Sequence, residues 1–510
     1  MSDHLLGIDV GTNSCKTIII DSAGKITDLT SREYKISTPQ YGWAEQHPED
    51  WFNAFKDGLK EILERKPYLS NNISAIGLTG QMVGLTLLDK NLHVLHPAII
   101  WMDQRCQKQV DYLRKNLEDV IRNITYNTLQ IYHTVAKILW VKENIPDVWK
   151  NVYKIQLPKD YIRLILTQKW YTDVNDASAT MMLDMKNLKW SDEIIGFAKI
   201  DKNKLPELIE SYNICGNLNK DIATELGLID GIPVITGAGD LASENFSTGI
   251  LNSSLRLSRL GTSASTSTVI DSPLFDPHGI SQCFAYFIPH KWIIESTYQS
   301  FGLSQKWFRD TFFSEEKVKI KKEKKDIYAL MSEMAEKVPI GSEGLFFNPF
   351  NSGSPYWNPN LRGAFYGVSL SHNKEHFTRA VFEGSAYGLK DTVMYLDDLI
   401  NISNYEYILV GGGSKSKVWS QIICDILRKN AFILENADAA LGAAMLAGVG
   451  TSVFKDFKDA IKKCVKTKRK IVFDNDNSKK YKQLYTVFKE IHKDLMDKSD
   501  LIQRTLKDIE

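Results

Sequence analysis

The sequence predicts an α/β protein built from two large domains. At 510 residues, the chain is too long for one ordinary hydrophobic core. Strand-like runs alternate with helical patterns along its length, which is typical of an α/β fold. A hairpin pattern with a hydroxyl-rich Gly-Thr turn opens each half of the chain, at residues 4–28 and again at residues 253–270. The two hairpins indicate an internal duplication, with one copy in each domain.

The first half reads as a hairpin followed by further strand and helix units. Within residues 4–28, an apolar strand, a Gly-Thr-Asn-Ser turn and the β-branched run at residues 17–20 predict two antiparallel strands. Residues 73–89 read as two strands around Gly80, and residues 152–168 read as a strand followed by a helix. These units continue the α/β alternation.

The second half repeats the alternation after its own hairpin. Residues 377–400 predict a long amphipathic helix, and residues 407–429 predict a strand, a Gly-rich turn and a helix. Residues 438–450 predict a helix of small residues. The charged run at residues 314–326 favours a solvated loop or helix face, and the Lys-rich segment beyond Lys455 favours surface helices.

The composition argues against several classes of function. Lys and Arg number 63 against 62 Asp and Glu, a formal net charge of +1, which disfavours a nucleic-acid or membrane-surface protein. The six cysteines form no Cys-x-x-Cys pair and no cluster with histidine, as expected for reduced, buried thiols. The N-terminus carries no targeting pattern, and no apolar run reaches about 18 residues. We therefore expect a soluble cytoplasmic protein with no nucleic-acid or membrane partner.

Three Gly-rich turns have the composition of phosphate or nucleotide contacts. Glycine lets a ligand approach the backbone, the amides and hydroxyls donate to anionic oxygens, and a nearby lysine adds positive charge. Any hairpin also favours Gly and Thr, so each turn alone is equally well explained by structure. The sequence has neither a Walker A motif nor a Gly-x-Gly-x-x-Gly motif in a suitable context. The candidate nucleotide-binding residues are Gly11, Thr12, Asn13, Lys16, Gly261, Thr262, Ser263, Gly411, Gly412, Gly413 and Ser416.

One acidic residue stands out in the segment "VITGAGDLASENFSTG" at residues 234–249. Asp240 follows a strand-like run and Thr-Gly-Ala-Gly, with no other charge before Glu244. A carboxylate placed there has few side chains beside it, so its partners are backbone, water or a ligand. Asp240 is therefore either a helix N-cap or a catalytic base.

Two long segments carry a family resemblance. "YHTVAKILWVKEN" at residues 132–144, with Lys137 and Trp140 in place, and "GAFYGVSLSHNKEHFTRAVFEG" at residues 363–384 resemble the two signature patterns of the FGGY carbohydrate kinases. The resemblance extends from about residue 4 to about residue 450. It implies two ribonuclease-H-like domains of the sugar kinase and actin-like ATPase superfamily, at residues 1–247 and 248–510, with a cleft between them.

The resemblance also implies an activity and site residues. Within the family the nearest likeness is to the xylulokinases, which implies phosphorylation of a small sugar hydroxyl by ATP with Mg²⁺, and D-xylulose as the leading substrate. By the same resemblance, Asp240 is the catalytic base and binds metal together with Asp9. The sequence leaves the oligomeric state open, with a homodimer as one option. The implied sugar-binding residues are Gln81, Met82, Val83, Asp103 and Asp240.

Several positions depart from the family pattern near the expected sugar. Val83 stands where xylulokinases typically have His, Leu241 where they usually have Asn, and residues 351–353 read Asn-Ser-Gly instead of Gly-Glu-Arg. Losing polar side chains changes which sugar hydroxyls the site can bind by hydrogen bonds. Ribulose, erythrulose, glycerol and gluconate therefore stay as alternative substrates, and a weakly catalytic paralogue or an actin-like ATPase switch as alternative functions.

Some motif residues have a structural alternative. Asp103 either faces the sugar, as the resemblance implies, or caps a helix beginning near Gln104. For Trp43, Glu45 and Gln46, which match a family motif, we expect a structural role.

Overall fold

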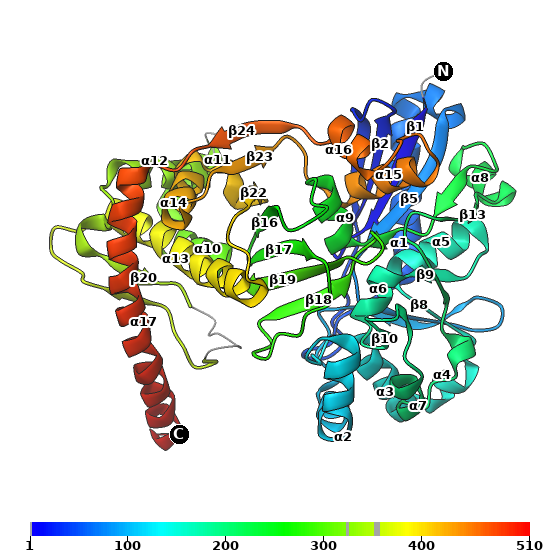
Figure 1. Cartoon of the computed structure of the whole chain (residues 1–510), viewed down its shortest axis with the longest axis horizontal. Coiled ribbons are helices and arrows are strands. Elements are labelled where there is room, and N and C mark those ends of the chain that lie inside the picture. The colour runs from blue at the N-terminus through cyan, green and yellow to red at the C-terminus, as the bar shows by residue number, and fades with distance from the viewer. Residues whose placement is uncertain (1–2, 323–325, 351–357, 510) are drawn as a thin grey trace.

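The computed structural model describes residues 3–322, 326–350 and 358–509, except the side chains of residues 321 and 322. Figure 1 shows two lobes, with the first half of the chain in one and most of the second half in the other. The long C-terminal helix runs along the outer side of the second lobe. Residues 351–353, where the sequence departs from the family pattern, lie outside the described residues.

The main sheet of the first lobe is centred on the N-terminal hairpin. Its strand order is β13-β14-β5-β1-β2-β3, and β15 pairs with β5 beyond β14. The strand β1 is antiparallel to β2 and parallel to β5. The strands of this sheet are β1 (His4–Val10), β2 (Ser14–Asp21), β3 (Ile26–Glu33), β5 (Ile73–Gly80), β13 (Ile214–Asn217), β14 (Pro233–Ile235) and β15 (Ala238–Gly239).

Smaller sheets and helices complete the first lobe. One small sheet has the order β4-β7-β6-β8, and β9 pairs with β12 and β10 with β11. These strands are β4 (Glu45–Gln46), β6 (Leu85–Leu88), β7 (Val94–Ile99), β8 (Lys154–Gln156), β9 (Tyr171–Asp173), β10 (Leu183–Asp184), β11 (Lys189–Trp190) and β12 (Glu207–Ile209). The helices are α1 (Pro48–Arg65), α2 (Gln107–Thr125), α3 (Thr134–Asn144), α4 (Pro146–Asn151), α5 (Pro158–Thr167), α6 (Val174–Ala179), α7 (Asp192–Phe197), α8 (Lys220–Leu226) and α9 (Asp240–Ser247).

The second lobe repeats the pairing of the first. Its sheet has the order β18-β19-β17-β16-β22-β23-β24, in which β16 is antiparallel to β17 and parallel to β22. This is the arrangement of β1 with β2 and β5, so the predicted duplication of the hairpins is confirmed. The strands are β16 (Leu255–Leu260), β17 (Ala264–Ile270), β18 (Ser281–Ala285), β19 (Trp292–Tyr298), β22 (Glu406–Val410), β23 (Ala431–Leu434) and β24 (Thr467–Ile471), and β20 (Phe346–Asn348) pairs separately with β21 (Ala364–Tyr366).

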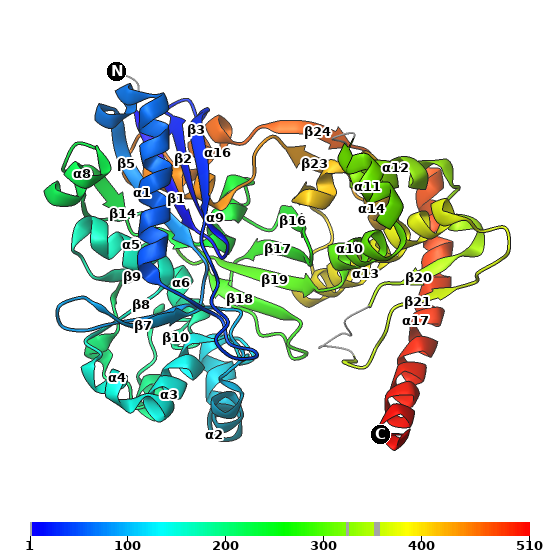
Figure 2. The same ribbon diagram turned by 180° about the vertical axis from the view of Figure 1, so that it is seen from behind.

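Most helices of the second half belong to the second lobe, with two exceptions. The helices of this half are α10 (Phe301–Phe312), α11 (Ser314–Lys322), α12 (Ile327–Lys337), α13 (Lys374–Ile400), α14 (Lys417–Leu427), α15 (Ala439–Gly450), α16 (Phe457–Cys464) and α17 (Asn475–Ile509). The exceptions are α15, which packs on β1 and β5 of the first lobe, and α16, which packs on α15 and α9. Figure 1 shows α15 on one face of the first-lobe sheet, and Figure 2 shows α1 on the opposite face of the same sheet.

Alternation along β1 explains how both faces of the first sheet are buried. Leu6, Ile8 and Val10 belong to the apolar cluster that includes α1 and α5. Leu5 belongs to a separate cluster that includes α9 and α15. Because successive side chains of a strand point to opposite faces, one strand contributes to both cores.

The two lobes are joined by a close contact between α9 and α15. Phe246 of α9 clusters with Val269 and Ile293 of the second sheet, whereas α15 lies on the first sheet. A Cβ atom added to Gly442 would lie 1.9 Å from the carbonyl oxygen of Ser243, and one added to Gly7 would lie 2.1 Å from that of Ala440. Glycine therefore permits backbone contact that no other residue allows here. A division of the chain at residue 247 does not describe the packing of α15.

The C-terminal segment differs from the predicted run of surface helices. The strand β24 lies between α16 and α17 and pairs with β23, so this segment extends the second sheet. Tyr481 and Phe488 of α17 are buried in the core of the second lobe. The apolar residues of α17 thus form a packed face, although the helix also carries seven lysines. Among the described residues, no helix is long and apolar enough to cross a membrane.

Candidate functional site

Asp240 is the first residue of α9, at the junction of the two lobes. Gly239 occupies the N-cap position, and no side chain caps the helix there. The Asp240 Oδ1 atom accepts a hydrogen bond of 2.8 Å from the backbone N–H of Leu241. The helix-cap alternative from the sequence is therefore not what the structure contains, although the carboxylate does lie at the positive end of a helix.

Close backbone packing fixes the chain on the N-terminal side of Asp240. The strand β15 pairs with β5, placing Gly239 opposite Gly80. Gly237 has a φ of +84°, and a Cβ there would lie 2.1 Å from the carbonyl oxygen of Leu78. The Gly239 N–H donates to Oδ1 of the buried Asn175 at 2.9 Å. The Thr-Gly-Ala-Gly segment thus positions the carboxylate that follows it.

The surroundings of Asp240 raise its pKa. Burial raises the pKa to about 6, Arg259 opposes this shift, and Glu244 and Glu295 add to it. Arg259 lies on β16 of the second hairpin and donates from Nε to Glu244 at 2.6 Å and from Nη1 to Glu295 at 3.2 Å. The second hairpin therefore delivers a guanidinium next to a carboxylate of the first half. A carboxyl group with a pKa near neutrality is suited to accept a proton.

Asp9 and Lys16 lie near Asp240 at the first hairpin. They are paired across β1 and β2, and Lys16 forms an ion pair with Asp438. Burial raises the pKa of Asp9 well above its ordinary value, and the charges of Asp240 and Asp438 raise it further. Asp9 Oδ1 is buried and has no hydrogen-bond partner within the described part of the chain. This oxygen is available to a ligand or cation.

Hydrogen bonds from side chains elsewhere in the first lobe hold the turn after Asp9. Gln46 donates to the carbonyl oxygen of Thr12 at 2.7 Å, and Trp101 donates from Nε1 to the Thr12 hydroxyl at 2.8 Å. Tyr34 donates to the carbonyl oxygen of Gly11. Asn13 remains exposed at the tip. Trp101, which is 45% exposed, was not predicted as a site residue.

Gln81, Met82 and Val83 follow β5 and lie beside this turn. Gln81 is buried and donates to Gln46 at 2.8 Å. A Cβ added to Gly239 would lie 2.7 Å from Cγ of Met82, so Met82 contacts the segment that carries Asp240. Met82 thus lies beside the segment that carries Asp240, and the sugar-binding role of these residues stays a prediction.

Val83 has a backbone conformation that is unusual for its type. Its φ is +57°, in the left-handed region that β-branched residues rarely adopt. Its carbonyl oxygen accepts from Lys137 Nζ at 2.8 Å and from the Thr134 hydroxyl at 3.1 Å. Burial lowers the pKa of Lys137 to about 7. The family-signature lysine therefore fixes the backbone of the segment next to the expected sugar.

Asp103 is buried within the first lobe, and its contact with a sugar stays a prediction. It is 0% exposed, and its oxygens accept from the Ala44 N–H at 2.7 Å and from the Arg105 guanidinium at 2.7–2.9 Å. The helix after it begins at Gln107, so Asp103 is not the predicted cap either. Arg105 also pairs with Glu45 at 2.7 Å and stacks on Trp43. These contacts favour the structural role expected for Trp43 and Glu45, and they extend it to Asp103.

The second-half turns lie together at the other side of the junction. A Cβ added to Gly302 would lie 2.2 Å from the carbonyl oxygen of Gly261, and one added to Gly411 would lie 2.8 Å from that of Leu260. The turns at residues 261–263 and 411–413 are therefore adjacent, with their backbones in contact. Thr262, Ser263, Gly411 and Gly412 are exposed. Ser416 instead caps α14, accepting from the Trp419 N–H at 3.1 Å.

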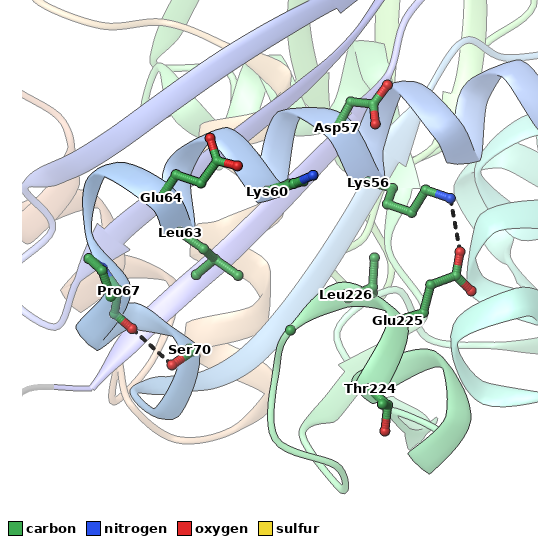
Figure 3. A pocket seen from close by; sticks show the side chains of 11 residues that line it. Lys56, Asp57, Lys60, Leu63, Glu64, Pro67, Ser70, Thr224, Glu225 and Leu226 are labelled. Atoms are coloured by element: carbon green, nitrogen blue, oxygen red, sulfur yellow. Dashed lines mark hydrogen bonds and ion pairs between the residues drawn. The ribbon is translucent and has the colours of Figure 1, made fainter.

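A surface groove between α1 and α8 lies apart from these residues. Figure 3 shows Lys56 and Glu225 facing each other across it, with their charged atoms 3.0 Å apart. Lys60 and Glu64 lie along the same helix. Three acidic residues and two lysines line it, and none of the candidate site residues does. We therefore place the functional site at the junction of the lobes.

Comparison with known proteins identifies the family of the chain. Residues 4–247 match the N-terminal domain, and residues 257–451 the C-terminal domain, of the FGGY family of carbohydrate kinases. The chain is 34% identical to the xylulose kinase of Lactococcus lactis, with 96% of both chains covered. It is 29% identical to the gluconokinase of Bacillus subtilis, with 96% of this chain and 95% of that protein covered. The solved structure of xylulose kinase from Rhodospirillum rubrum is 25% identical and matches with a TM-score of 0.88, covering 98% of this chain and 100% of that one. The chain therefore belongs to the FGGY family of carbohydrate kinases.

Proposed function

We propose that the protein phosphorylates a small ketose with ATP, with D-xylulose as the leading substrate and D-xylulose 5-phosphate and ADP as products. The observation that carries this proposal is the position of Asp240, a carboxyl group with a pKa of about 6 at the start of α9, between the two Gly-Thr hairpins. The similarity to proteins named xylulose kinases supports the choice of sugar. The six cysteines are free and buried, which supports a cytoplasmic location.

In the proposed reaction, Asp240 acts as the general base. Its Oδ1 atom is engaged by the Leu241 N–H, which leaves Oδ2 for the sugar hydroxyl. The carboxylate takes the hydroxyl proton as that oxygen forms a bond to the γ-phosphorus. The bond from the γ-phosphorus to the bridging oxygen of the β-phosphate breaks, and ADP leaves. Backbone amides of the Thr12 and Thr262 turns and the Lys16 ammonium hold the phosphates in line.

Asp9 and Asp240 fit a site for Mg²⁺ that accompanies ATP. Mg²⁺ prefers oxygen ligands and usually takes only one or two carboxylates, keeping several waters. Asp9 Oδ1 is a buried oxygen with no hydrogen-bond partner in the described residues, as expected for an atom that binds metal or metal-bound water. When bound, Mg²⁺ supplies positive charge that offsets the charge of the transferred phosphoryl group.

The homodimer stays a prediction, which sedimentation analysis tests.

A coupled assay of ADP release tests the proposed function. Purified protein is given ATP, Mg²⁺ and one acceptor at a time from a panel of pentuloses, tetruloses, polyols and aldonates. ADP release that depends on a ketose supports the proposal. Release without any acceptor would indicate an ATPase switch, and binding of a sugar without release would indicate a non-catalytic paralogue.

The rate should fall on the acid side of neutrality. Because the pKa of Asp240 is raised to about 6, the group is the required carboxylate above this pH and is protonated below it. We expect kcat/KM for the sugar to decrease about tenfold for each pH unit below about 6, since kcat/KM reports the free enzyme. Initial rates from pH 4.5 to 8 measure this. A profile that stays flat down to pH 4.5 would contradict the role of Asp240 as base.

Gly412→Val should weaken ATP binding without unfolding the protein. A Cβ added to Gly412 meets no atom of the described residues within 4 Å, so the side chain projects into the space where the nucleoside is expected. We expect KM for ATP to rise at least tenfold while KM for the sugar changes little. The control is Gly196→Val, since Gly196 also has open space around it but lies in α7, away from the turns. Unchanged KM for ATP in the Gly412 variant would remove this turn from the nucleotide site.

Val83→His should improve the use of D-xylulose. Val83 and Leu241 are buried in one apolar cluster, at 6% and 7% exposure, so neither offers a polar contact to a sugar hydroxyl. Histidine adds a donor and an acceptor and tolerates a positive φ better than valine does. We expect kcat/KM for D-xylulose to rise about 3- to 20-fold, the worth of one hydrogen bond. Tight, fast phosphorylation of D-xylulose by the unaltered protein would contradict this inference.

A gluconate kinase is the second candidate. The gluconokinase of Bacillus subtilis matches nearly the whole chain, and the two apolar replacements favour a sugar that is read differently from D-xylulose. The acceptor panel separates these functions because the ketose and the aldonate are compared at equal concentration.

A further inference from the structure

Asp438 holds the amine of Lys16, the lysine of the first hairpin. Its Oδ2 atom accepts from Lys16 Nζ, and its Oδ1 atom accepts from the Ala440 N–H at 2.9 Å as the N-cap of α15. Its own backbone N–H donates to the Ser247 hydroxyl of α9 at 2.9 Å. The carboxylate is therefore fixed at the helix, and Lys16 reaches across to it from β2.

This ion pair stands where the phosphates of ATP are expected. Lys16 and Asp438 are 34% and 23% exposed, so a ligand can reach both of them. Burial alone lowers the pKa of Lys16, but attraction to Asp438 outweighs it and the pKa is raised. Lys16 is thus charged and already has an anionic partner. A phosphate must compete with that partner.

Other charged residues near Lys16 also affect the competition between Asp438 and a phosphate for its amine. After burial, the charges of Asp240, Asp438 and Glu244 all raise the pKa of Asp9, which means that four carboxylates share this region. The terminal phosphate must lie beside Asp240, because the sugar hydroxyl attacks it there. Lys16, paired with Asp9 across β1 and β2, is the cation of the first hairpin that faces the same place.

We propose that Asp438 is a latch residue, which competes with the terminal phosphate of ATP for Lys16. The proposal rests on the proposed function of the same site. In the nucleotide-free protein Lys16 stays with Asp438, and the γ-phosphate displaces that carboxylate when ATP binds. After transfer the phosphoryl group leaves on the sugar, and Lys16 returns to Asp438. The latch therefore weakens ATP binding and has little effect on ADP binding, because ADP lacks the competing phosphate.

The test replaces the charge and keeps the cap. Asp438→Asn retains the Oδ1 atom that accepts from the Ala440 N–H, and Asn and Asp are nearly equal as N-caps. The matched control is Asp456→Asn, since Asp456 caps α16 by accepting from the Asp459 N–H at 2.8 Å and pairs with no lysine of the hairpin. Asp438→Ser, another capping side chain without charge, is the second variant should the first fold poorly.

Calorimetry with Mg²⁺ and either AMP-PNP or ADP gives the decisive numbers. We expect Asp438→Asn to bind AMP-PNP about three- to fivefold more tightly, the worth of a partly exposed ion pair, and to bind ADP within 1.5-fold of the unaltered protein. The control should change neither affinity.

Three other results would overturn the latch. Unchanged affinity for AMP-PNP would leave Asp438 as a cap only. Weaker binding that more Mg²⁺ restores would make it part of the metal site. Equal tightening of both nucleotides would mean that it repels phosphate in general. Failure of the unaltered protein to bind AMP-PNP would contradict the proposed function, and the latch with it.

Discussion

Gly442→Ala is expected to destabilise the protein by about 3 kcal/mol, at the upper end of what overpacking costs. The added Cβ would lie 1.9 Å from the carbonyl oxygen and 2.5 Å from the carbonyl carbon of Ser243. Both atoms belong to the backbone of α9, so no side-chain rotation relieves the contact. The helices α9 and α15 must move apart, and the apolar cluster that joins the lobes is opened. Alanine in a helix normally gains about 0.5–1 kcal/mol over glycine, which is too little to offset this.

The measurement is the free energy of unfolding from urea denaturation, with Gly196→Ala as the matched control. Gly196 is also helical, but a Cβ there meets nothing within 4 Å. The control should be stabilised by up to about 1 kcal/mol, whereas the Gly442 variant should unfold at lower urea. Because α9 carries Asp240, the Gly442 variant should also lose activity before it unfolds. Equal midpoints for the two variants would show that α9 and α15 are not held in close contact.

The hairpins were predictable from the sequence because their signals are local. Glycine and threonine between two apolar runs specify a turn within a few residues, so both hairpins were found with their turns. The position of α15 was not predictable in this way. Its small apolar residues lie on nearly every side of the helix, and ten of its twelve residues are buried. No hydrophobic periodicity therefore identifies one buried face of this helix. The glycines that determine its packing add no hydrophobic signal.

The candidate site likewise has some features that local sequence predicts and others that it does not. Asp240 and the Gly-rich turns were recognised from a few neighbouring residues, and the structure places them at the junction of the lobes. Asp103 was predicted to face the sugar, but its acceptor role toward Ala44 spans 59 residues and no local pattern reveals it. Trp101 was missed for the same reason, since its hydrogen bond to Thr12 spans 89 residues. The signal that the sequence offered was a tryptophan just beyond an apolar, strand-like run.

Asp240→Asn is expected to lower kcat by roughly 10²–10⁴-fold, the usual worth of a general base. The amide oxygen of asparagine can still accept from the Leu241 N–H, as Oδ1 does at 2.8 Å, so the start of α9 should be unchanged. Its amide cannot take the proton of the sugar hydroxyl. The attack on phosphorus then proceeds without base assistance, which is the step that the substitution isolates.

Stability and binding distinguish this loss from damage to the fold. The pKa of Asp240 is raised to about 6 in the folded protein. At pH 8 the carboxylate is ionised in both states, and its ionisation costs free energy in the folded state but not in the unfolded chain. Asparagine removes that cost, so the melting temperature should stay the same or rise. Affinity for AMP-PNP should survive. The control is Asp326→Asn at the cap of α12, where the carboxylate accepts from the Tyr328 N–H at 3.0 Å and full activity is expected. A folded, nucleotide-binding Asp240→Asn protein that phosphorylates its sugar at near-normal rate would return Asp240 to a structural role at the start of α9.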